Sequence, residues 1–208
     1  MGQLAGKQVK EKSPTRRIKQ DMSEEYLSDE QLAVLALKDQ THFVTLVSRY
    51  KRRLFDYLKF FCRLSDDDVE DILQSVFIKI YYNLNDFDGD LKFSSWAYRI
   101  AHNEAVSFLR KKKKTTDIAC DFIENLPHSS DLAEELDLAL EQKNVSQILC
   151  LMDEKYREVL LLKYFEQKDY KEISDILRKP MGTVATLINR AKKQFKDKYQ
   201  TYAGKNRG

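Results

Sequence analysis

The chain has 208 residues, of which 42% are hydrophobic and 33% charged, with only six glycines and three prolines. This length allows one or two domains with real cores, and the scarcity of glycine and proline favours helices over turn-rich sheets. No apolar run reaches 18 residues, and the basic N-terminus lacks an apolar core. The sequence therefore predicts neither a transmembrane helix nor a secretory signal.

The three cysteines, Cys62, Cys120 and Cys150, are odd in number and widely spaced. They match neither a zinc-binding pattern nor a disulfide framework. A reducing, cytoplasmic location is the natural prediction.

The net charge of +3 conceals a segmental pattern. Residues 1–22 carry a charge of +4, residues 23–114 are balanced, residues 115–142 hold eight acids without Lys or Arg, and residues 143–208 carry +7. Two basic blocks around an acidic connector fit a nucleic-acid binder whose field is local. We interpret residues 1–22 as a disordered basic tail. The residues leave open whether it contacts nucleic acid or is only a solubilising end, and we favour the second.

The first domain, residues 23–114, reads as a series of helices. The first is expected over Asp29–Leu37, and the second carries a long apolar stripe from Phe43 to Phe61. Ser65 with Asp68 three positions later resembles a capping box and starts a further helix, which buries residues between Val69 and Leu84. The opposite face of the second helix is basic: Arg49, Lys51, Arg52 and Arg53.

Turn-forming residues, Asn85–Asp90, interrupt this pattern before another helix over Ser94–Lys113. Aromatic and cationic residues gather within two turns of that helix: Trp96, Tyr98, Arg99, His102 and Asn103. Aromatic rings beside cations suit unstacked bases. The residues alone leave open whether Trp96 and Tyr98 meet bases or pack in the core.

We expect an acidic linker over residues 115–143, with a short helix from Asp131. A second helical domain follows over residues 144–201, and residues 202–208 form a tail. In this domain a helix over Asp169–Leu177 is joined to the last helix by only four residues, Arg178–Met181. A helix, a short turn with glycine and a second helix form the helix-turn-helix motif, whose second helix enters the major groove.

The last helix, over Thr183–Phe195, is amphipathic and basic, and Pro180 and Gly182 precede it. Its apolar positions recur at helical spacing: Val184, Leu187, Ile188, Ala191 and Phe195. The opposite face offers groups that donate to phosphate or read base edges: Thr183, Thr186, Asn189, Arg190, Lys193 and Lys196. This arrangement favours DNA binding over an ordinary solvated face.

Enzyme signatures are missing from the sequence. The acids between Asp66 and Asp71 have no paired histidine, and serving the helix dipole explains them better than a metal site does. We find no glycine-rich phosphate loop and no nucleophile elbow. The sequence predicts no catalytic residues, no metal and no cofactor.

An ordered set of motifs carries a family resemblance. It comprises DVEDILQSVFIKIYYNL, an aspartate-rich loop, FSSWAYRIAHN, a lysine run, DEKYREVLLLKYFEQKDYKEISDIL and PMGTVATLINRAKKQ. The chain resembles bacterial sigma factors of the extracytoplasmic-function type, which keep two of the sigma domains. The resemblance implies an all-α fold of two small helical domains joined by the acidic linker, the second being a helix-turn-helix.

The resemblance also implies roles for individual residues. RNA polymerase core would contact the polar face of the helix over Val69–Leu84 at Asp71, Gln74 and Lys79. The minus-ten promoter element would meet Asn85, Asp86, Phe87, Trp96, Arg99, Asn103, Arg110 and Lys111. The minus-thirty-five element would meet Thr183, Ala185, Thr186, Asn189, Arg190 and Lys193.

The same family resemblance implies promoter DNA and RNA polymerase core as partners, with an anti-sigma protein that blocks both domains. Two positions depart from the family pattern. Ala185-Thr186 replaces a frequent Arg-Ser pair after GTV, and Ser107 replaces a frequent Asp three residues before Arg110. The exact promoter sequence is therefore not predicted.

Three other functions are alternatives. A stand-alone helix-turn-helix regulator would bind duplex DNA without polymerase. An interaction protein would use the first domain to dock a partner. A nucleic-acid enzyme would use the acids from Asp66 to Asp71 with a metal.

Overall fold

The computed structural model describes residues 26–89, 91–112, 131–132, 136 and 142–205. Every regular element within those residues is a helix. The N-terminal domain contains α2 (Asp29–Ala36), α3 (Thr41–Cys62), α4 (Asp66–Tyr82), the 3₁₀ turn η1 (Leu84–Asp86) and α5 (Phe93–Lys112). The C-terminal domain contains α7 (Gln142–Cys150), α8 (Glu154–Leu160), the π-helical segment η2 (Leu161–Phe165), α9 (Tyr170–Leu177) and α10 (Met181–Lys205).

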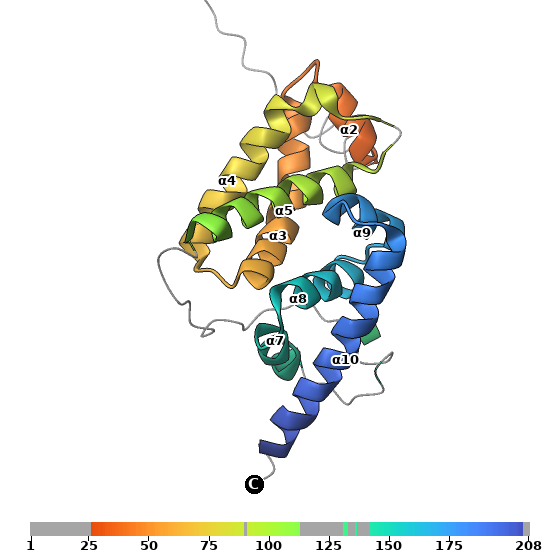
Figure 1. Cartoon of the computed structure of the whole chain (residues 1–208). Coiled ribbons are helices and arrows are strands. Elements are labelled where there is room, and N and C mark those ends of the chain that lie inside the picture. Colours follow the sequence, from red (N-terminus) through yellow and green to blue (C-terminus); the bar gives the residue numbers. More distant parts are fainter. Residues whose placement is uncertain (1–25, 90, 113–130, 133–135, 137–141, 206–208) are drawn as a thin grey trace, which may run out of the picture.

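The N-terminal domain packs α3, α4 and α5 around an aromatic and aliphatic core, with α2 across α3 and α5 (Figure 1). The apolar stripe of α3 is buried as its spacing predicted, with Tyr50, Leu54, Leu58 and Phe61 at most 1% exposed. Aromatic rings make edge contacts inside this core, including Tyr50 with Phe93. Burial of these rings and of the aliphatic side chains around them stabilises the domain.

Local signals set the helix boundaries. The predicted cap at Ser65 is present, since its hydroxyl accepts the backbone N–H of Asp68. A reciprocal capping box begins α2, where Ser28 and Gln31 bond each other's backbone. At α4 the Asp68 carboxylate instead accepts the Ser65 hydroxyl. The sequence carries the Ser-x-x-Gln signal of α2, although our sequence analysis did not use it. The α3 helix ends at Arg63, which adopts the left-handed conformation with φ of 58°.

The C-terminal domain is built around α10, the longest helix of the described chain. Its apolar face packs on α8, α9 and α7. Four of the five predicted core positions on this helix, Val184, Ile188, Ala191 and Phe195, are fully buried. The helix continues to Lys205, ten residues beyond the predicted end, because Tyr199 also packs on the core and Tyr202 bonds Gln147 of α7.

The two domains lie against each other (Figure 1). The α9 helix contacts α5, and α8 and η2 contact α3. Most of the acidic linker lies outside the described residues, and so does most of the short helix predicted from Asp131. Of the linker, Leu132 is fully buried and Asp131 accepts a hydrogen bond from Gln167. No helix in the described part of the chain is long and apolar enough to cross a membrane.

Candidate polymerase and nucleic-acid interfaces

The polar face of α4 presents the predicted polymerase-binding residues to solvent. Asp71, Gln74 and Lys79 are all exposed. Lys79 is already engaged, because its ammonium forms an ion pair with Glu104 of α5. All three predicted residues are therefore accessible, and Asp71 and Gln74 are the two that this ion pair does not involve.

Two of the acids that begin α4 pair with cations of neighbouring helices, Asp66 with Lys59 of α3 and Asp68 with Lys112 of α5. The Asp68 carboxylate accepts hydrogen bonds from the Lys112 ammonium at 2.6 Å and from the Ser65 hydroxyl at 2.7 Å. These hydrogen bonds, that from Lys112 above all, lower the pKa of Asp68. Within the described residues no group of three or more metal-binding side chains exists.

The predicted minus-ten loop has two exposed residues and one anchored ring. Asn85 and Asp86 lie exposed on η1. Phe87 is half-buried, with its ring 5.3 Å from that of Trp96 and 5.4 Å from that of Phe93. The loop is thus held against the core by Phe87 while its polar groups face outward.

The structure decides the alternatives left open for Trp96 and Tyr98. Trp96 is 8% exposed and packs against Phe87 and Phe93, and Tyr98 is fully buried. In this arrangement both are core residues, so neither ring offers a face to a base. A contact between Trp96 and a melted strand would need a rearrangement of the loop.

The remaining minus-ten candidates on α5 are accessible, and three of the four share one side of the helix. Arg99 is partly exposed, and Asn103, Arg110 and Lys111 are exposed. Arg99, Asn103 and Arg110 stand four and seven residues apart, which places them on one face. Together with Asn85 and Asp86 they make up the accessible portion of the predicted minus-ten surface.

The helix-turn-helix motif contains α9, a three-residue turn and α10. A reciprocal capping box starts α9, with Asp169 bonded to the backbone N–H of Glu172 and Glu172 bonded to that of Asp169. The first of these bonds lowers the pKa of Asp169. The Asp-x-x-Glu spacing signals this cap, although our sequence analysis did not use it.

The turn itself differs from the prediction. We expected Gly182 to form part of the turn, but it lies in the first turn of α10, where an added Cβ would meet nothing within 4 Å. The reversal is made instead by Arg178, which takes the left-handed conformation with φ of 51°. Pro180 then precedes α10, and its carbonyl accepts the N–H groups of Thr183 and Val184.

The outer face of α10 matches the prediction for a groove-reading helix in its geometry. Thr183, Thr186, Asn189, Arg190 and Lys193 are exposed, and Ala185 is partly exposed. The Thr186 hydroxyl donates to the carbonyl of Gly182 at 2.8 Å, which leaves its lone pairs outward as acceptors. The side chains of Asn189, Arg190 and Lys193 lie exposed at the surface of the helix.

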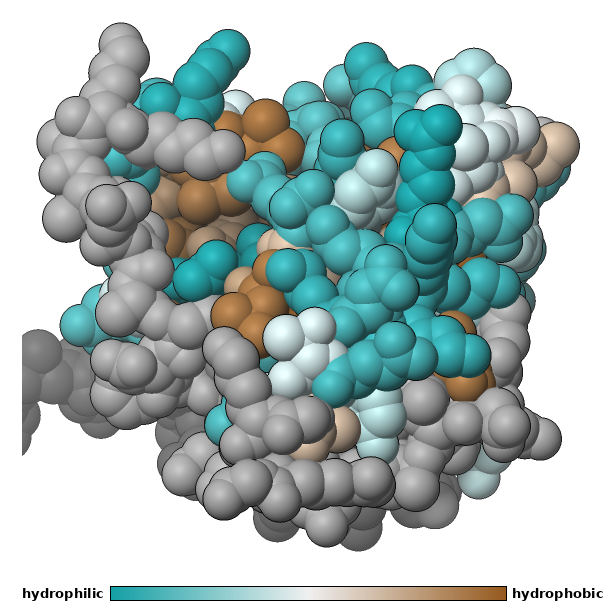
Figure 2. Space-filling model, turned by 60° about the horizontal axis from the view of Figure 1, so that its bottom comes forward, coloured by the Kyte–Doolittle hydropathy of each residue, from teal (hydrophilic) through white to brown (hydrophobic). Residues whose placement is uncertain are grey.

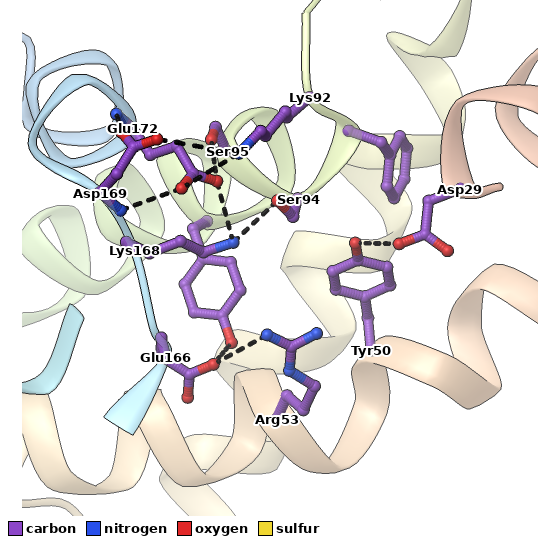
Figure 3. A network of polar contacts seen from close by, with 12 residues as sticks. Asp29, Tyr50, Arg53, Lys92, Ser94, Ser95, Glu166, Lys168, Asp169 and Glu172 are labelled. Carbon is purple, nitrogen blue, oxygen red and sulfur yellow. Dashed lines mark hydrogen bonds and ion pairs between the residues drawn. The ribbon is translucent and has the colours of Figure 1, made fainter. Parts of the chain in front are cut away.

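A polar network between the domains was not predicted (Figure 3). The Glu166 carboxylate, 8% exposed, accepts the phenol of Tyr98 and lies 3.4 Å from the guanidinium of Arg53. The Lys168 ammonium donates to Ser94 at 2.7 Å. Both residues of the C-terminal domain thereby bond to α3 or α5.

The network extends beyond Glu166 and Lys168 to α8. Glu158 accepts the phenol of Tyr57 at 2.7 Å and lies 2.5 Å from Nδ1 of His102. The guanidinium of Arg157 donates to the carbonyl of Phe61 at 2.9 Å.

At the far end of the network, Glu172 lies 3.4 Å from Lys92 and accepts the hydroxyl of Ser95. Every buried charged residue described in the C-terminal domain thus bonds across the interface; these are Arg157, Glu158, Glu166, Lys168 and Glu172.

Burial shapes the protonation of these groups. Loss of solvent raises the pKa of Glu166 and lowers that of Lys168, since each charged form prefers water. Loss of solvent, together with the neighbouring carboxylate, raises the pKa of Tyr57 and of Tyr98. The phenols therefore stay protonated and act as hydrogen-bond donors to the two glutamates.

The comparisons with known proteins agree with this architecture. Residues 46–115 match the family model for Sigma-70 region 2, and residues 142–195 match that for Sigma-70, region 4. The chain is similar to the ECF RNA polymerase sigma factor SigW of Bacillus subtilis, with 36% identity over 76% of this chain and 91% of that protein. It is also similar to the ECF RNA polymerase sigma-E factor of Escherichia coli K12, with 32% identity over 85% and 96%.

Two solved structures share the fold. CnrH, solved with the cytosolic domain of CnrY, has a TM-score of 0.60 at 26% identity, over 81% of this chain and 95% of that chain. The sigma factor RpoE of Bartonella quintana, solved with the anti-sigma factor NepR, has a TM-score of 0.58 at 20% identity, over 76% and 96%. The chain belongs to the ECF RNA polymerase sigma factors. It is a transcription initiation factor that directs RNA polymerase to promoters, and a stand-alone regulator is not favoured.

Proposed function

We propose that the two domains divide promoter recognition between them. The N-terminal domain binds RNA polymerase core through Asp71 and Gln74 on α4. Its α5 face, with Arg99, Asn103 and Arg110, holds the backbone and bases of the melted minus-ten strand. The α10 helix reads the minus-thirty-five element as duplex.

One observation carries this proposal. A short capped helix, a tight turn and α10 present a solvated face of Thr, Asn, Arg and Lys beside a fully buried apolar face. Hydroxyls, amides and guanidinium groups at those positions can donate to phosphate and read base edges in the major groove. The aromatic core of the N-terminal domain holds α5 in place, so that its exposed face can bind the minus-ten strand.

Three further elements of the proposal follow from the family. We propose that the factor performs no catalytic step of its own and acts in the cytoplasm. We also propose an anti-sigma protein as a partner, because two structural neighbours were solved with such partners or with a second protein. The acidic linker would then thread through the polymerase channel, where its charge mimics that of nucleic acid.

The decisive test is transcription in vitro. Purified core polymerase would be mixed with genomic fragments, with and without this chain. Promoter-specific RNA only in its presence supports the proposal. Binding of duplex DNA without any effect of polymerase would support a stand-alone regulator instead.

The polymerase surface has its own test. The change Gln74→Ala removes an exposed amide from α4 without disturbing the core, so it should weaken capture of core polymerase severalfold while helicity stays constant. Gln200→Ala, an exposed glutamine on α10, is the matched control. Equal retention of polymerase by both variants in a pull-down would contradict the assignment of Gln74.

A further inference from the structure

The contact between the domains places the two proposed DNA surfaces close together. The Ser95 hydroxyl and the Glu172 carboxylate lie 3.4 Å apart, which joins α5 to α9. Ten residues of helix and turn separate Glu172 from Thr183 at the start of the groove-reading face. At about 1.5 Å per helical residue and 3.6 Å per extended residue, Arg99 and Asn189 lie no more than about 50 Å apart.

A promoter needs a longer reach. The minus-ten and minus-thirty-five elements are about 25 base pairs apart, or about 85 Å of B-DNA at 34–36 Å per turn. A duplex of this length is far shorter than its persistence length of about 150 base pairs, so it does not fold back. The closed arrangement of the chain cannot hold both elements of one promoter.

The sequence between the domains is long enough to remove this conflict. Thirty peptide units join Lys112 to Gln142. At about 3.3 Å per residue, a chain of this length reaches up to about 100 Å once Asp131 has released Gln167 and Leu132 has left its buried position. The domains can therefore part far enough for both elements while remaining on one chain.

The contact between the domains is partly polar. Apolar residues of both domains join one core, but five charged side chains of the C-terminal domain are also withdrawn from water at the interface. Desolvation offsets much of the attraction between buried charges, so a satisfied network of this kind adds little net stability. Losing one donor, in contrast, leaves a buried carboxylate unsatisfied and strongly disfavours closure.

We propose that Glu158 and Glu166 form a latch that holds the free chain in a closed, autoinhibited state. Glu158 accepts the phenol of Tyr57 and lies beside Nδ1 of His102. Glu166 accepts the phenol of Tyr98 and lies beside the guanidinium of Arg53. Opening the latch frees α9 and α10 to reach the minus-thirty-five element. This inference rests on the proposed division of promoter recognition, and it adds the regulation of that recognition.

The latch lowers the apparent affinity for the promoter. A protein whose competent state is only a fraction of the population binds more weakly by that same fraction. Loss of one hydroxyl bond to a carboxylate shifts the ratio of closed to open chains by about tenfold or more. Weakening the latch should therefore raise promoter use at low concentrations of the factor.

The test compares two sets of tyrosine variants of the full chain. Tyr57→Phe with Tyr98→Phe removes both donor hydroxyls of the latch and keeps both rings. Tyr50→Phe is the matched control, because its buried phenol also donates to a carboxylate, that of Asp29, within the N-terminal domain. Small-angle scattering measures the radius of gyration, and transcription with core polymerase measures the concentration of factor needed for half-maximal RNA.

The latch predicts that the double variant expands and needs severalfold less factor, while Tyr50→Phe matches the wild type in both. A wild type already as expanded as the double variant, or a double variant as compact as the wild type, overturns the latch. If circular dichroism shows that the double variant has lost helix, Tyr57→Phe and Tyr98→Phe are tested singly, because each leaves one carboxylate of the latch without its phenol donor and decides the same question. Absence of promoter-specific RNA with the wild type would instead refute the proposed function. The comparison of radii of gyration would still test the latch in that case.

Discussion

The C-terminal domain carries charged and polar groups on two faces that meet opposite surroundings. On α10, Asn189, Arg190 and Lys193 lie in solvent. On the side that meets the other domain, five charged side chains are buried, among them Glu158 of α8 and Glu166, which follows η2. Hydrated cations exchange their counterions for phosphate readily, whereas desolvated charges require fixed partners. The first face is therefore suited to DNA and the second to holding the domains together.

The same contrast divides α5, and there we expect the largest effect. Trp96→Ala should lower the free energy of unfolding by about 3–5 kcal/mol, because the indole packs in the core with Phe87 and Phe93. Urea unfolding measures the loss, and Trp96→Phe, which keeps most of the packing, should lose less. An unchanged midpoint together with lost promoter opening would show that Trp96 serves DNA rather than the core.

The exposed face of α10 should respond to salt. Arg190→Ala should weaken promoter binding and lower the slope of its salt dependence by about one unit, since one phosphate contact is lost. Binding titrations over a range of salt concentrations measure this slope. Lys155→Ala, which removes an exposed cation of α8 in the same domain, is the control. Equal slopes for both variants would argue against a phosphate at Arg190.

Two neighbouring arginines of α3 sharpen the comparison further. Arg53 pairs across the interface with Glu166, while Arg52 pairs with Asp56 of its own helix at 2.7 Å. Both guanidinium groups are substantially exposed, so each pair contributes only about 0–1 kcal/mol. Arg53→Met should nevertheless increase the radius of gyration, and Arg52→Met should not. The same expansion in both variants would mean that the interface does not depend on Arg53.

The smallest effect concerns pH. Tyr98, Arg53 and Lys168 surround Glu166, yet burial still raises its pKa above the ordinary 4.5. The closed state therefore binds this proton more tightly than the open state, and its share should rise as pH falls through the raised pKa towards 4.5. Scattering across this range should show compaction in the wild type and a flatter response in Glu166→Gln. Identical profiles would remove Glu166 from the pH response.

Periodicity and capping made much of the fold predictable. The stripe from Phe43 to Phe61 and the cap at Ser65 are local signals, and the structure confirms both. Exposure of Gln74 and of the outer face of α10 also follows from helical spacing. Their contacts with polymerase and DNA stay predictions.

Tertiary contacts account for what the sequence left undecided. Helical spacing could not tell whether Trp96 faces the core or a base, because both sides of α5 carry aromatic or small residues. Glu158 and Glu166 are charged residues, which the sequence alone would place on a solvated face. Only the packing of one domain on the other buries them. The turn was misassigned to Gly182 because Arg178 adopts a left-handed conformation that composition does not signal.

Site-directed cleavage of promoter DNA tests the central claim most directly. An iron chelate would be attached to Arg99→Cys or Asn189→Cys in a Cys120→Ser background, with the buried Cys62 and Cys150 left in place. With core polymerase on one promoter, we predict cleavage near the minus-ten element from position 99 and near the minus-thirty-five element from position 189, about 25 base pairs apart. Cleavage at a single common site, or none from position 189, would contradict the account.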